Sequence, residues 1–334
     1  MKRIGIITMY YQNFNYGGQL QAYALQKAVE KLGVNCDQIC VNYSTTNSAK
    51  QKIKSYIKKE GIWFTIKLVG SKLIYWLPNR IFVKRSYRKR MENFWDFSNN
   101  IPHSDKIYTW DTIKESEKNY FGYIVGSDQV WNPNYYSKSN FLDINLLKFC
   151  GDETKKMAYA ASIGVSNFLA EAKEQFAREL NRFDYISVRE ETARNILQPL
   201  TKKNIEVVLD PTFLLTKEEW SLAAAEYIHK DYIAGYFLGE TKQARKNTAR
   251  VAKRQNKKFV LFTGLQPNFM RQDYIFGAEK ESTAGPAEWL GIIKNAGLVI
   301  TNSFHGTVFS ILFEKQFVVM ITDKSSKYKT GNSR

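Results

Sequence analysis

The sequence predicts an α/β protein of two domains, each built around a parallel β-sheet. Short apolar runs alternate with amphipathic helical stretches along the chain, a pattern typical of parallel sheets. With 334 residues, of which 44% are hydrophobic, the chain has enough apolar side chains for two cores. The Asp210-Pro211 step ends one apolar run and is the best candidate for a boundary. We therefore expect domains at 1–210 and 211–334, with a ligand site in the cleft between them.

The first expected element is a strand at 4–8, followed by a turn and a helix. Leu25, Val29 and Leu32 share one face of that helix, which Gly33 ends. Further strands of the first domain are expected at 123–125, 157–161, 185–188 and 206–209. Those of the second domain are expected at 232–238, 259–262, 298–301 and 317–321.

A basic insertion at about 48–118 interrupts this alternation in the first domain. Lysine and arginine are dense within 50–90, Glu60 is the only acid there, and aromatic side chains such as Trp63 and Trp76 lie among them. One interpretation is an interfacial helix that contacts the membrane surface or a lipid-linked substrate. The other is a helical insertion packed on the first domain, with its basic face in solvent, and the pattern favours this second interpretation.

Composition excludes some classes of function and leaves others open. A net charge of +17 attracts anions in general. We expect no nucleic-acid partner, since no helix-turn-helix, zinc finger or RNP-like run is present. Cys36, Cys40 and Cys150 have neither paired spacing nor a nearby histidine, so we expect no disulfide framework and no metal site. No run has the length of a signal peptide or membrane span, which predicts a cytoplasmic protein whose 50–90 segment is the candidate contact with the inner membrane face.

The strongest candidate for chemistry lies where the expected strand at 298–301 runs into a helix. The free N–H groups at a helix start favour a bound phosphate, and His305 can add a proton donor there. Alternatively, Ser303 caps the helix and His305 fills a gap. We favour the anion site, because the other two histidines have no such context. The same turn contains Asn302, Gly306 and Thr307 as candidate binding residues.

Two further segments also follow expected strands. Gly17 and Gly18, flanked by Asn15 and Gln19, allow close approach of a ligand or of another backbone, or serve a tight turn. They do not match the dinucleotide-binding fingerprint. Arg189 is suited to bind a carboxylate or phosphate, or to pair with a neighbouring glutamate.

The segment 126–133 combines a carboxylate, amides and an indole, a mixture that often holds carbohydrates. Ser127, Gln129 and Trp131 are its candidate binding residues. Asp128 is either a general base for an acceptor hydroxyl or a cap of the following turn.

In this order the segments 15–23, 126–133, 187–190, 209–212 and 301–307 resemble the polysaccharide pyruvyl transferase family. The runs G-S-D-Q-V-W-N-P and T-N-S-F-H-G-T are the most specific, and the resemblance spans nearly the whole chain. It implies a GT-B-like fold of two Rossmann-like domains and phosphoenolpyruvate as donor, with no metal or nucleotide cofactor. It also implies a glycan or lipid-linked oligosaccharide as acceptor, which forms a ketal as phosphate leaves.

The resemblance further implies roles for single residues. His305 would lie at the phosphoenolpyruvate site, as the acid that protonates carbon or as a phosphate ligand, and Arg189 would reach the donor's carboxylate or phosphate. Asn302 and Ser303 would complete the anion pocket. Because family members ordinarily continue through a further helical segment, we expect the chain to be truncated after 334 and impaired in cleft closure.

Two other functions remain as alternatives. A GT-B glycosyltransferase with a nucleotide sugar would place a diphosphate at the same helix start, but needs a ribose- or base-binding group that the sequence does not reveal. A non-catalytic glycan- or membrane-binding module accounts for the basic aromatic stretch at 50–90. It leaves His305 and Arg189 without a role.

Overall fold

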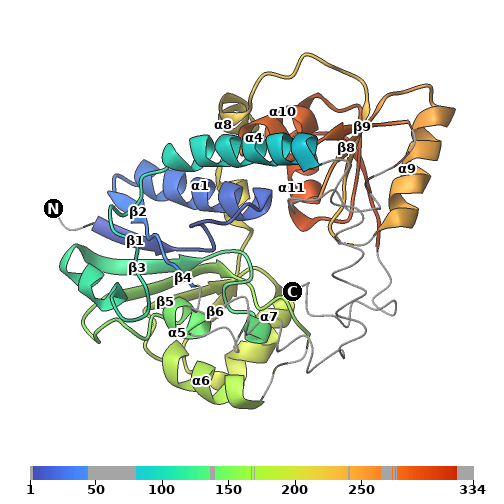
Figure 1. Ribbon diagram of the computed structural model, residues 1–334. Helices are drawn as coiled ribbons and strands as arrows, with labels where there is room; N and C mark the ends of the chain where they lie inside the picture. The colour runs from blue at the N-terminus through green and yellow to red at the C-terminus, as the bar shows by residue number, and fades with distance from the viewer. Residues whose placement is uncertain are drawn as a thin grey trace, which may run out of the picture.

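The computed structural model contains two parallel β-sheets with helices packed on both faces (Figure 1). It describes residues 3–43, 80–135, 140–166, 168, 170–239, 241–264, 273, 275 and 277–321. Most of the basic aromatic stretch at 50–90 lies outside these residues. The expectation that this stretch contacts a membrane, and the expectation for the chain end, therefore remain predictions.

The first sheet has six strands in the order β2-β1-β3-β4-β5-β6, and all its pairings are parallel. Its strands are β1 (Arg3–Ile7), β2 (Cys36–Gln38), β3 (Tyr120–Gly126), β4 (Lys155–Ala161), β5 (Tyr185–Val188) and β6 (Ile205–Val207). Each strand expected from an apolar run is present. The sequence did not predict β2, because a three-residue strand that contains Asp37 and Gln38 shows no apolar run.

The second sheet has five parallel strands in the order β11-β10-β7-β8-β9. Its strands are β7 (Ile233–Tyr236), β8 (Phe259–Phe262), β9 (Ala278–Glu281), β10 (Leu298–Thr301) and β11 (Gln316–Val319). The sequence missed β9, an edge strand of composition AEKE with no buried residue. The expected boundary at 210/211 falls on the connection between β6 and β7.

Helices cover both sheets. They are α1 (Tyr16–Lys31), α4 (Arg80–Asn99), α5 (Phe141–Asn145), α6 (Ala170–Leu180), α7 (Glu191–Leu197), α8 (Lys217–Ala223), α9 (Lys242–Arg254), α10 (Pro286–Asn295) and α11 (Phe304–Leu312). Short 3-10 turns occur at Ile113–Lys118, Pro133–Tyr135, Gln198–Leu200 and Pro211–Leu214. Figure 1 shows α1 and α4 side by side on one face of the first sheet, with α5, α6 and α7 on the other.

Capping residues fix where α1 begins and ends. The side chain of Asn15 accepts a hydrogen bond from the backbone N–H of Gly18, and Gly33 follows with a φ of 76°. Leu25 and Val29 are buried as expected, but Leu32 is 80% exposed. The sequence prediction was wrong for Leu32, which is the C-cap and lies beyond the last helical residue of α1.

The helix α1 joins the two halves of the protein, because its first residues enter the core of the second. Tyr16, Leu20 and Ala24 are buried in one cluster with residues of α8, α10 and the second sheet. The ring of Tyr16 stacks on Trp289 at a centroid distance of 5.5 Å, and its hydroxyl donates to the carbonyl of Ala284 at 2.9 Å. The helix α1, which follows the first strand of the first sheet, thus stabilises the second half of the protein.

The helix α4 makes a second link, although it lies within the insertion that the sequence assigns to the first domain. The guanidinium of Arg90 donates to the Gly264 carbonyl, the Thr263 hydroxyl and the Glu281 carbonyl at 2.9, 2.9 and 3.1 Å. The amide of Asn93 donates to the Thr283 carbonyl at 3.0 Å. The described part of the insertion therefore packs on the second domain as well.

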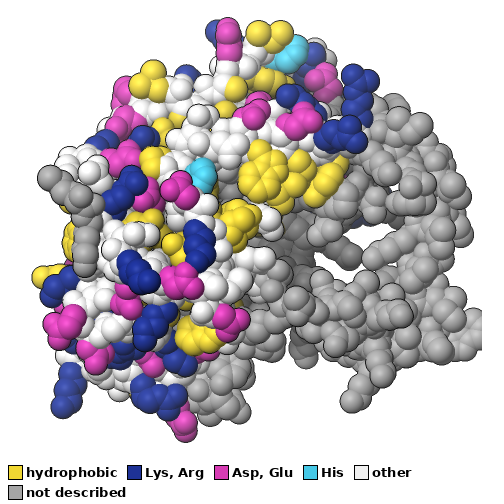
Figure 2. Space-filling model, turned by 60° about the vertical axis from the view of Figure 1, so that its left-hand side comes forward, with side chains coloured by type: hydrophobic (Ala, Val, Ile, Leu, Met, Phe, Trp, Pro, Cys, Tyr) yellow, Lys and Arg dark blue, Asp and Glu magenta, His cyan; other side chains and the backbone are white. Residues whose placement is uncertain are grey.

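The structure describes the helices, the cysteines and the surface charges on which the general expectations depend. No helix within the described part of the chain is both long and apolar enough to cross a membrane. All three cysteines are buried as free thiols. Lysines and arginines are interspersed with acidic side chains over the described surface drawn in Figure 2.

Replacing Arg90 with alanine tests the link made by α4. Arg90 is 3% exposed, and its loss removes the donor to the Gly264 carbonyl and to the Thr263 hydroxyl, while the Glu281 carbonyl still accepts from the N–H of Thr263. We expect the free energy of unfolding in urea to fall by roughly 2–4 kcal/mol. The matched control is Arg88→Ala on the exposed face of the same helix, which should change it by less than about 0.5 kcal/mol. Equal losses in both variants would contradict the link.

Candidate functional site

The turn between β10 and α11 places His305 at the start of a helix. Ser303 is the N-cap of α11, and its hydroxyl accepts a hydrogen bond from the Gly306 N–H at 3.3 Å. The hydroxyl of Thr301 donates to the Tyr236 carbonyl at 2.6 Å and so ties the turn to β7. A Cβ atom at position 306 would overlap Thr301, which explains the glycine there. The helix start is therefore held in one geometry.

The imidazole of His305 lies directly against the first turn of α1. A Cβ atom at position 17 would overlap the imidazole, with Nδ1 as the nearest atom. The glycine therefore serves close approach, as the sequence suggested, but the group that approaches is a side chain of the second domain. His305 is 9% exposed, so both halves of the protein enclose the ring.

Asp210 is the centre of this site. The sequence analysis placed it at the domain boundary and in a segment of the family resemblance, but gave it no role in the site. Its side chain is fully buried. One carboxylate oxygen accepts from Arg189 Nη1 and from the Ser127 hydroxyl, both at 2.8 Å. The other accepts from the backbone N–H of Thr212 at 3.0 Å and from its hydroxyl at 2.8 Å. Its signal in the sequence was an acid at the end of an expected strand, a position close to that of Asp128 after the strand at 123–125.

Arg189 is held on several sides. In addition to the pair with Asp210, its Nε lies 3.7 Å from a carboxylate oxygen of Glu190, and its guanidinium lies 4.3 Å from the ring centroid of Phe304. Glu190 is itself fixed by the Ser162 hydroxyl at 2.8 Å and the Ile163 N–H at 2.9 Å. The alternative of a salt bridge to a neighbouring glutamate is thus present in part, while the shorter pair is with Asp210.

One buried polar atom in the site lacks a partner. Nε2 of His305 is 3.9 Å from the nearer carboxylate oxygen of Asp210, too far for a hydrogen bond, and it bonds to no other group that the structure describes. A buried donor or acceptor without a partner costs about 1–3 kcal/mol. Such an atom beside a helix start and an arginine indicates a place for a ligand.

The charges around His305 act on its pKa in opposite directions. Burial lowers the pKa of His305 below its usual 6.5, while the negative charges of Asp210 and Asp128 raise it and Arg189 lowers it further. Burial alone would raise the pKa of Asp210, but His305, Arg189 and the hydrogen bonds to Arg189 and Thr212 hold that pKa below its usual 3.8. At neutral pH the unliganded site thus contains a neutral imidazole beside a carboxylate that is paired with a guanidinium.

Asp128 lies near this group in a strained backbone conformation. Its φ is 59°, and one carboxylate oxygen accepts from the N–H of Gln129 at 2.9 Å. The turn-capping alternative is therefore observed. The side chain is half-buried, and its charge acts on the pKa of His305, so it also belongs to the site. Gln129 accepts from the Asn132 amide at 2.7 Å and packs on Gly164.

Trp131 does not face a ligand, and the interpretation of its indole as part of a carbohydrate site is corrected. The side chain is 0% exposed and meets the rings of Phe176 and Phe183 edge to face in the first core. Its indole N–H donates to the Asn145 carbonyl at 2.9 Å. An indole at a strand end can serve the core or a ligand, and the sequence does not distinguish the two.

Several other candidates hold the loops of the site. The amide of Gln19 donates to backbone carbonyls of Tyr10 and Asn13 at 3.0 and 2.7 Å. The side-chain amide of Asn302 makes two hydrogen bonds with the backbone of Leu238: its oxygen accepts from the N–H at 2.7 Å, and its nitrogen donates to the carbonyl at 3.0 Å. Thr307 donates to the Ser303 carbonyl at 3.1 Å. The structure thus brings His305, Arg189, Ser127 and Gly17 together, with Asp128 and Ser303 beside them, while Asn15, Gln19, Asn302 and Thr307 make structural bonds.

Metal ligands form no cluster among the residues that the structure describes. No group of three or more His, Cys, Asp or Glu side chains there could hold an ion. The described site contains the carboxylates of Asp210 and Asp128, the guanidinium of Arg189, the imidazole of His305 and a helix start.

Comparison with known families decides the class of protein. The family model described as polysaccharide pyruvyl transferase matches residues 15–324. The chain belongs to this family. The resemblance drawn from the sequence motifs is therefore confirmed, and the match includes every candidate residue of the site. A search of curated proteins gave no significant match.

Solved structures resemble this pyruvyl transferase family member in fold. The UDP-GlcNAc 2-epimerase of Methanocaldococcus jannaschii has a TM-score of 0.54 and 11% identity, covering 97% of this chain and 85% of that one. A putative UDP-N-acetylglucosamine 2-epimerase of Listeria monocytogenes has a TM-score of 0.51 and 12% identity, covering 96% and 80%. At such identity the likeness shows the fold alone. It confirms the GT-B-like arrangement of two parallel sheets.

Replacing Gly17 with alanine tests the contact with His305. Alanine in a helix normally stabilises by about 1 kcal/mol relative to glycine, but here the new methyl group would overlap a buried imidazole. We expect the clash to dominate and to lower the free energy of unfolding by about 1–3 kcal/mol.

The matched control is Gly151→Ala, where the new methyl group would lie 3.7 Å from Glu117, an ordinary contact distance. Urea unfolding of both variants measures the difference. A Gly17→Ala protein as stable as the wild type would show that the ring and the helix are not in contact.

The pH dependence of stability tests the burial of His305. Because the folded-state pKa is lowered, the unfolded chain binds more protons as the pH falls through about 6.5, and stability is lost. Between about pH 7.5 and pH 5.5, the wild type should lose up to about 1.4 kcal/mol more than His305→Gln. Urea unfolding at both pH values checks this, with His229→Gln on the surface as control. Parallel losses in the wild type and His305→Gln would contradict a buried neutral imidazole.

Proposed function

We propose that the protein transfers a pyruvyl group from phosphoenolpyruvate to two hydroxyls of a glycan or lipid-linked sugar, forming a ketal and releasing phosphate. The observation that carries this proposal is the buried Nε2 of His305, which has no hydrogen-bond partner among the residues that the structure describes. It lies beside the Arg189–Asp210 pair at the start of α11. Membership of the pyruvyl transferase family supports the reaction class. Phosphoenolpyruvate as the donor is what the family resemblance implies, and the anion-binding groups of the site support it.

The donor carries a carboxylate and a phosphate, and the site offers a cation and helix N–H groups for them. The guanidinium of Arg189 is fixed by Asp210 and by Phe304, which presents its remaining N–H groups in one orientation. The backbone N–H groups at the start of α11 favour negative charge. The donor's anionic groups would thus lie beside His305.

Donor binding would change the protonation state of His305. The free site holds a neutral imidazole because burial lowers its pKa. An incoming phosphate or carboxylate adds negative charge beside the ring, which raises the pKa and favours the imidazolium. Asp210 then stabilises that imidazolium from 3.9 Å. The acid would therefore form when the donor is bound, not before.

The reaction then proceeds by proton transfer and two additions. His305 gives its proton to the methylene carbon of the donor, which becomes a methyl group, and the adjacent carbon becomes an oxocarbenium-like centre. One sugar hydroxyl adds to that carbon and loses its proton, for which the half-buried carboxylate of Asp128 is the candidate base. A second hydroxyl then adds to the same carbon as phosphate leaves, and its proton passes to the departing phosphate, which closes the ketal. Arg189 and the helix start stabilise the leaving phosphate.

The place of reaction is a further proposal. Contact of the 50–90 stretch with the inner face of the membrane is the less favoured interpretation of its basic and aromatic side chains, and we keep it as a proposal for a cytoplasmic enzyme. Such contact would bring a lipid-linked acceptor to the site.

Phosphate release and donor binding test the reaction together. We expect the wild type to release phosphate from phosphoenolpyruvate only when an acceptor glycan is present, and His305→Gln to lose about 100-fold or more in rate. Calorimetry in two buffers of different ionisation enthalpy should show proton uptake on donor binding near pH 7.5, absent in His305→Gln. The control His229→Gln alters an exposed histidine and should match the wild type.

Two results would oppose the proposal in different ways. If His305→Gln binds the donor with the same proton uptake as the wild type, His305 is not the group that gains the proton. If phosphoenolpyruvate neither binds nor reacts while a nucleotide sugar such as UDP-GlcNAc does, pyruvyl transfer is refuted and the glycosyltransferase alternative replaces it.

A further inference from the structure

The helix α9 differs in its charge from the other helices that the structure describes. Six of its thirteen residues are lysine or arginine, and none is aspartate or glutamate. Every other α-helix in the described part of the chain that contains a lysine or arginine also contains an acid. Figure 1 shows α9 on the outer side of the second half, away from the first sheet. The helix therefore presents a single sign of charge at the surface.

The basic side chains of α9 gather on one face. Arg245 is buried and pairs with Asp273 at 3.3 Å. The other five are exposed and, at about 3.6 residues per turn, fall within an arc of about 120° opposite the buried Ala244, Thr248 and Ala252. The basic face of α9 consists of these five residues: Lys242, Lys246, Arg250, Lys253 and Arg254. It extends about 18 Å along the helix.

The described acids do not neutralise this basic face. Among the residues that the structure describes, no carboxylate forms an ion pair with any of the five side chains. The next two lysines along the chain do form ion pairs, Lys257 with Asp231 at 2.6 Å and Lys258 with Glu279 at 3.3 Å. Acids thus lie within reach of the residues that follow α9, but they do not pair with its basic face.

This arrangement is unfavourable for a helix that faces only water. Three pairs of like charges stand four residues apart along the face, beginning with Lys242 and Lys246, and such pairs repel. The first turn contains no acid and begins with Lys242, although the positive end of the helix dipole lies there. An anionic partner against the face would offset both effects. Exposed residues that break local rules of stability in this way indicate a function.

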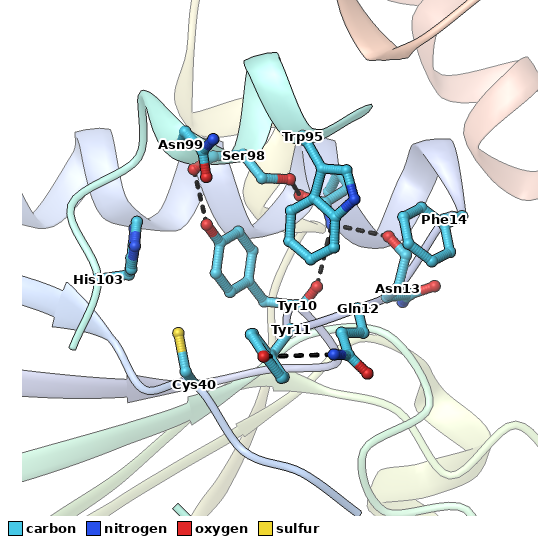
Figure 3. A pocket seen from close by; sticks show the side chains of 11 residues that line it. Tyr10, Tyr11, Gln12, Asn13, Phe14, Cys40, Trp95, Ser98, Asn99 and His103 are labelled. Carbon is cyan, nitrogen blue, oxygen red and sulfur yellow. Dashed lines mark hydrogen bonds between the residues drawn. The ribbon is translucent and has the colours of Figure 1, made fainter. Parts of the chain in front are cut away.

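A hollow beside the loop that precedes α1 offers an anionic partner no site. Residues 10–14, the end of α4 and His103 line it, and no lysine or arginine is among its eleven lining residues (Figure 3). Its volume is about 30 Å³, which leaves room for one or two waters. An anion attracted by the net charge of +17 therefore finds cations on the exposed basic face of α9 and none in this hollow.

The shape and composition of the basic face favour a membrane surface over a polyanionic chain. Single strands of nucleic acid and sugar rings are commonly held against aromatic side chains, and α9 contains no aromatic residue. A membrane with anionic lipids is broad, and it attracts lysines and arginines that come within about 10 Å of it, without insertion of apolar groups. An exposed helix face of five basic side chains meets that requirement.

The basic face begins near the proposed reaction site. Leu238 lies in the connection between β7 and α9, and its backbone makes two hydrogen bonds with the side chain of Asn302. Asn302 directly precedes the N-cap of α11, while Lys242 follows Leu238 by four residues, which span at most about 14 Å. A membrane at the start of the basic face would therefore lie near the turn that contains His305.

We propose that the basic face of α9 binds the surface of a membrane that contains anionic phospholipids. The contact is electrostatic and requires no inserted side chain. Its consequence for a lipid-linked acceptor, which it would bring towards His305, rests on the proposed function. The binding itself does not, because it is measured without donor or acceptor.

Co-sedimentation of the full chain with vesicles tests the inference. Vesicles of phosphatidylcholine with about 30% phosphatidylserine carry negative charge, whereas vesicles of phosphatidylcholine alone do not. At about 0.1 M salt we expect at least about tenfold tighter binding to the anionic vesicles. At about 1 M salt this preference should be lost, because the Debye length falls to about 3 Å.

A triple variant of the basic face tests whether α9 makes the contact. Lys246→Gln, Arg250→Gln and Lys253→Gln together remove three charges, each of which contributes about fivefold near an anionic surface. We expect binding to the anionic vesicles to weaken at least about tenfold. The variant should be no less stable in urea than the wild type, because glutamine suits a helix and all three like-charge pairs are removed.

A second triple variant is the matched control for net charge. Lys173→Gln, Lys202→Gln and Lys203→Gln also remove three exposed charges, but from the first half of the protein. This variant should bind the anionic vesicles within about twofold of the wild type. Equal weakening in both triple variants would show that net charge alone drives binding, and the inference would be overturned.

The remaining outcomes separate the inference from the proposed function. The inference fails if the wild type does not bind anionic vesicles, or if the α9 variant binds them as the wild type does. It also fails if the α9 variant loses binding to a soluble polyanion such as heparin but not to vesicles, because the partner is then a polyanionic chain. Loss of vesicle binding in the α9 variant supports the inference whether or not phosphoenolpyruvate reacts. Phosphate release with a soluble acceptor should then equal that of the wild type.

Discussion

The buried carboxylate of Asp210 is the constraint on which the rest of the site depends. A carboxylate removed from water costs several kcal/mol unless it is paired and fully hydrogen-bonded. Here the compensation comes from three places in the chain: the end of β3 through Ser127, the end of β5 through Arg189, and the turn at Thr212. The requirement therefore fixes three loops relative to one another. It also orients the guanidinium beside His305.

The site also requires that the two halves of the protein stay packed against each other. His305 belongs to the second half, yet its ring is enclosed by Gly17 from the first. The packing of Tyr16 on Trp289 and the bonds of Arg90 hold α1 and α4 against the second half. Burial between the two halves lowers the pKa of the imidazole, and these contacts help to keep the halves together.

The sequence alone predicts most strands and part of the site, for physical reasons that differ between elements. Buried parallel strands such as β10 begin with an unbroken apolar run and are therefore easy to recognise, whereas β9 lies at an edge and has no buried residue. His305 and Arg189 stand at strand ends, where parallel sheets expose ligands. The role of Asp210 depends on partners that are 21 and 83 residues away in the sequence, and the burial of Trp131 depends on helix α6. Such long-range packing leaves no local pattern.

The entry of α1 into the second core has a consequence for cooperativity. In many two-domain proteins each half can be excised and folds alone, because few contacts cross the boundary. Here a cut between 210 and 211 would separate Tyr16, Leu20 and Phe94 from the core of the second half. The apolar side chains around Trp289 would then be exposed to water. The first half would carry those aromatic side chains into water. The two sheets are therefore separate in the fold but do not form two independently stable units, and the molecule should unfold as one unit.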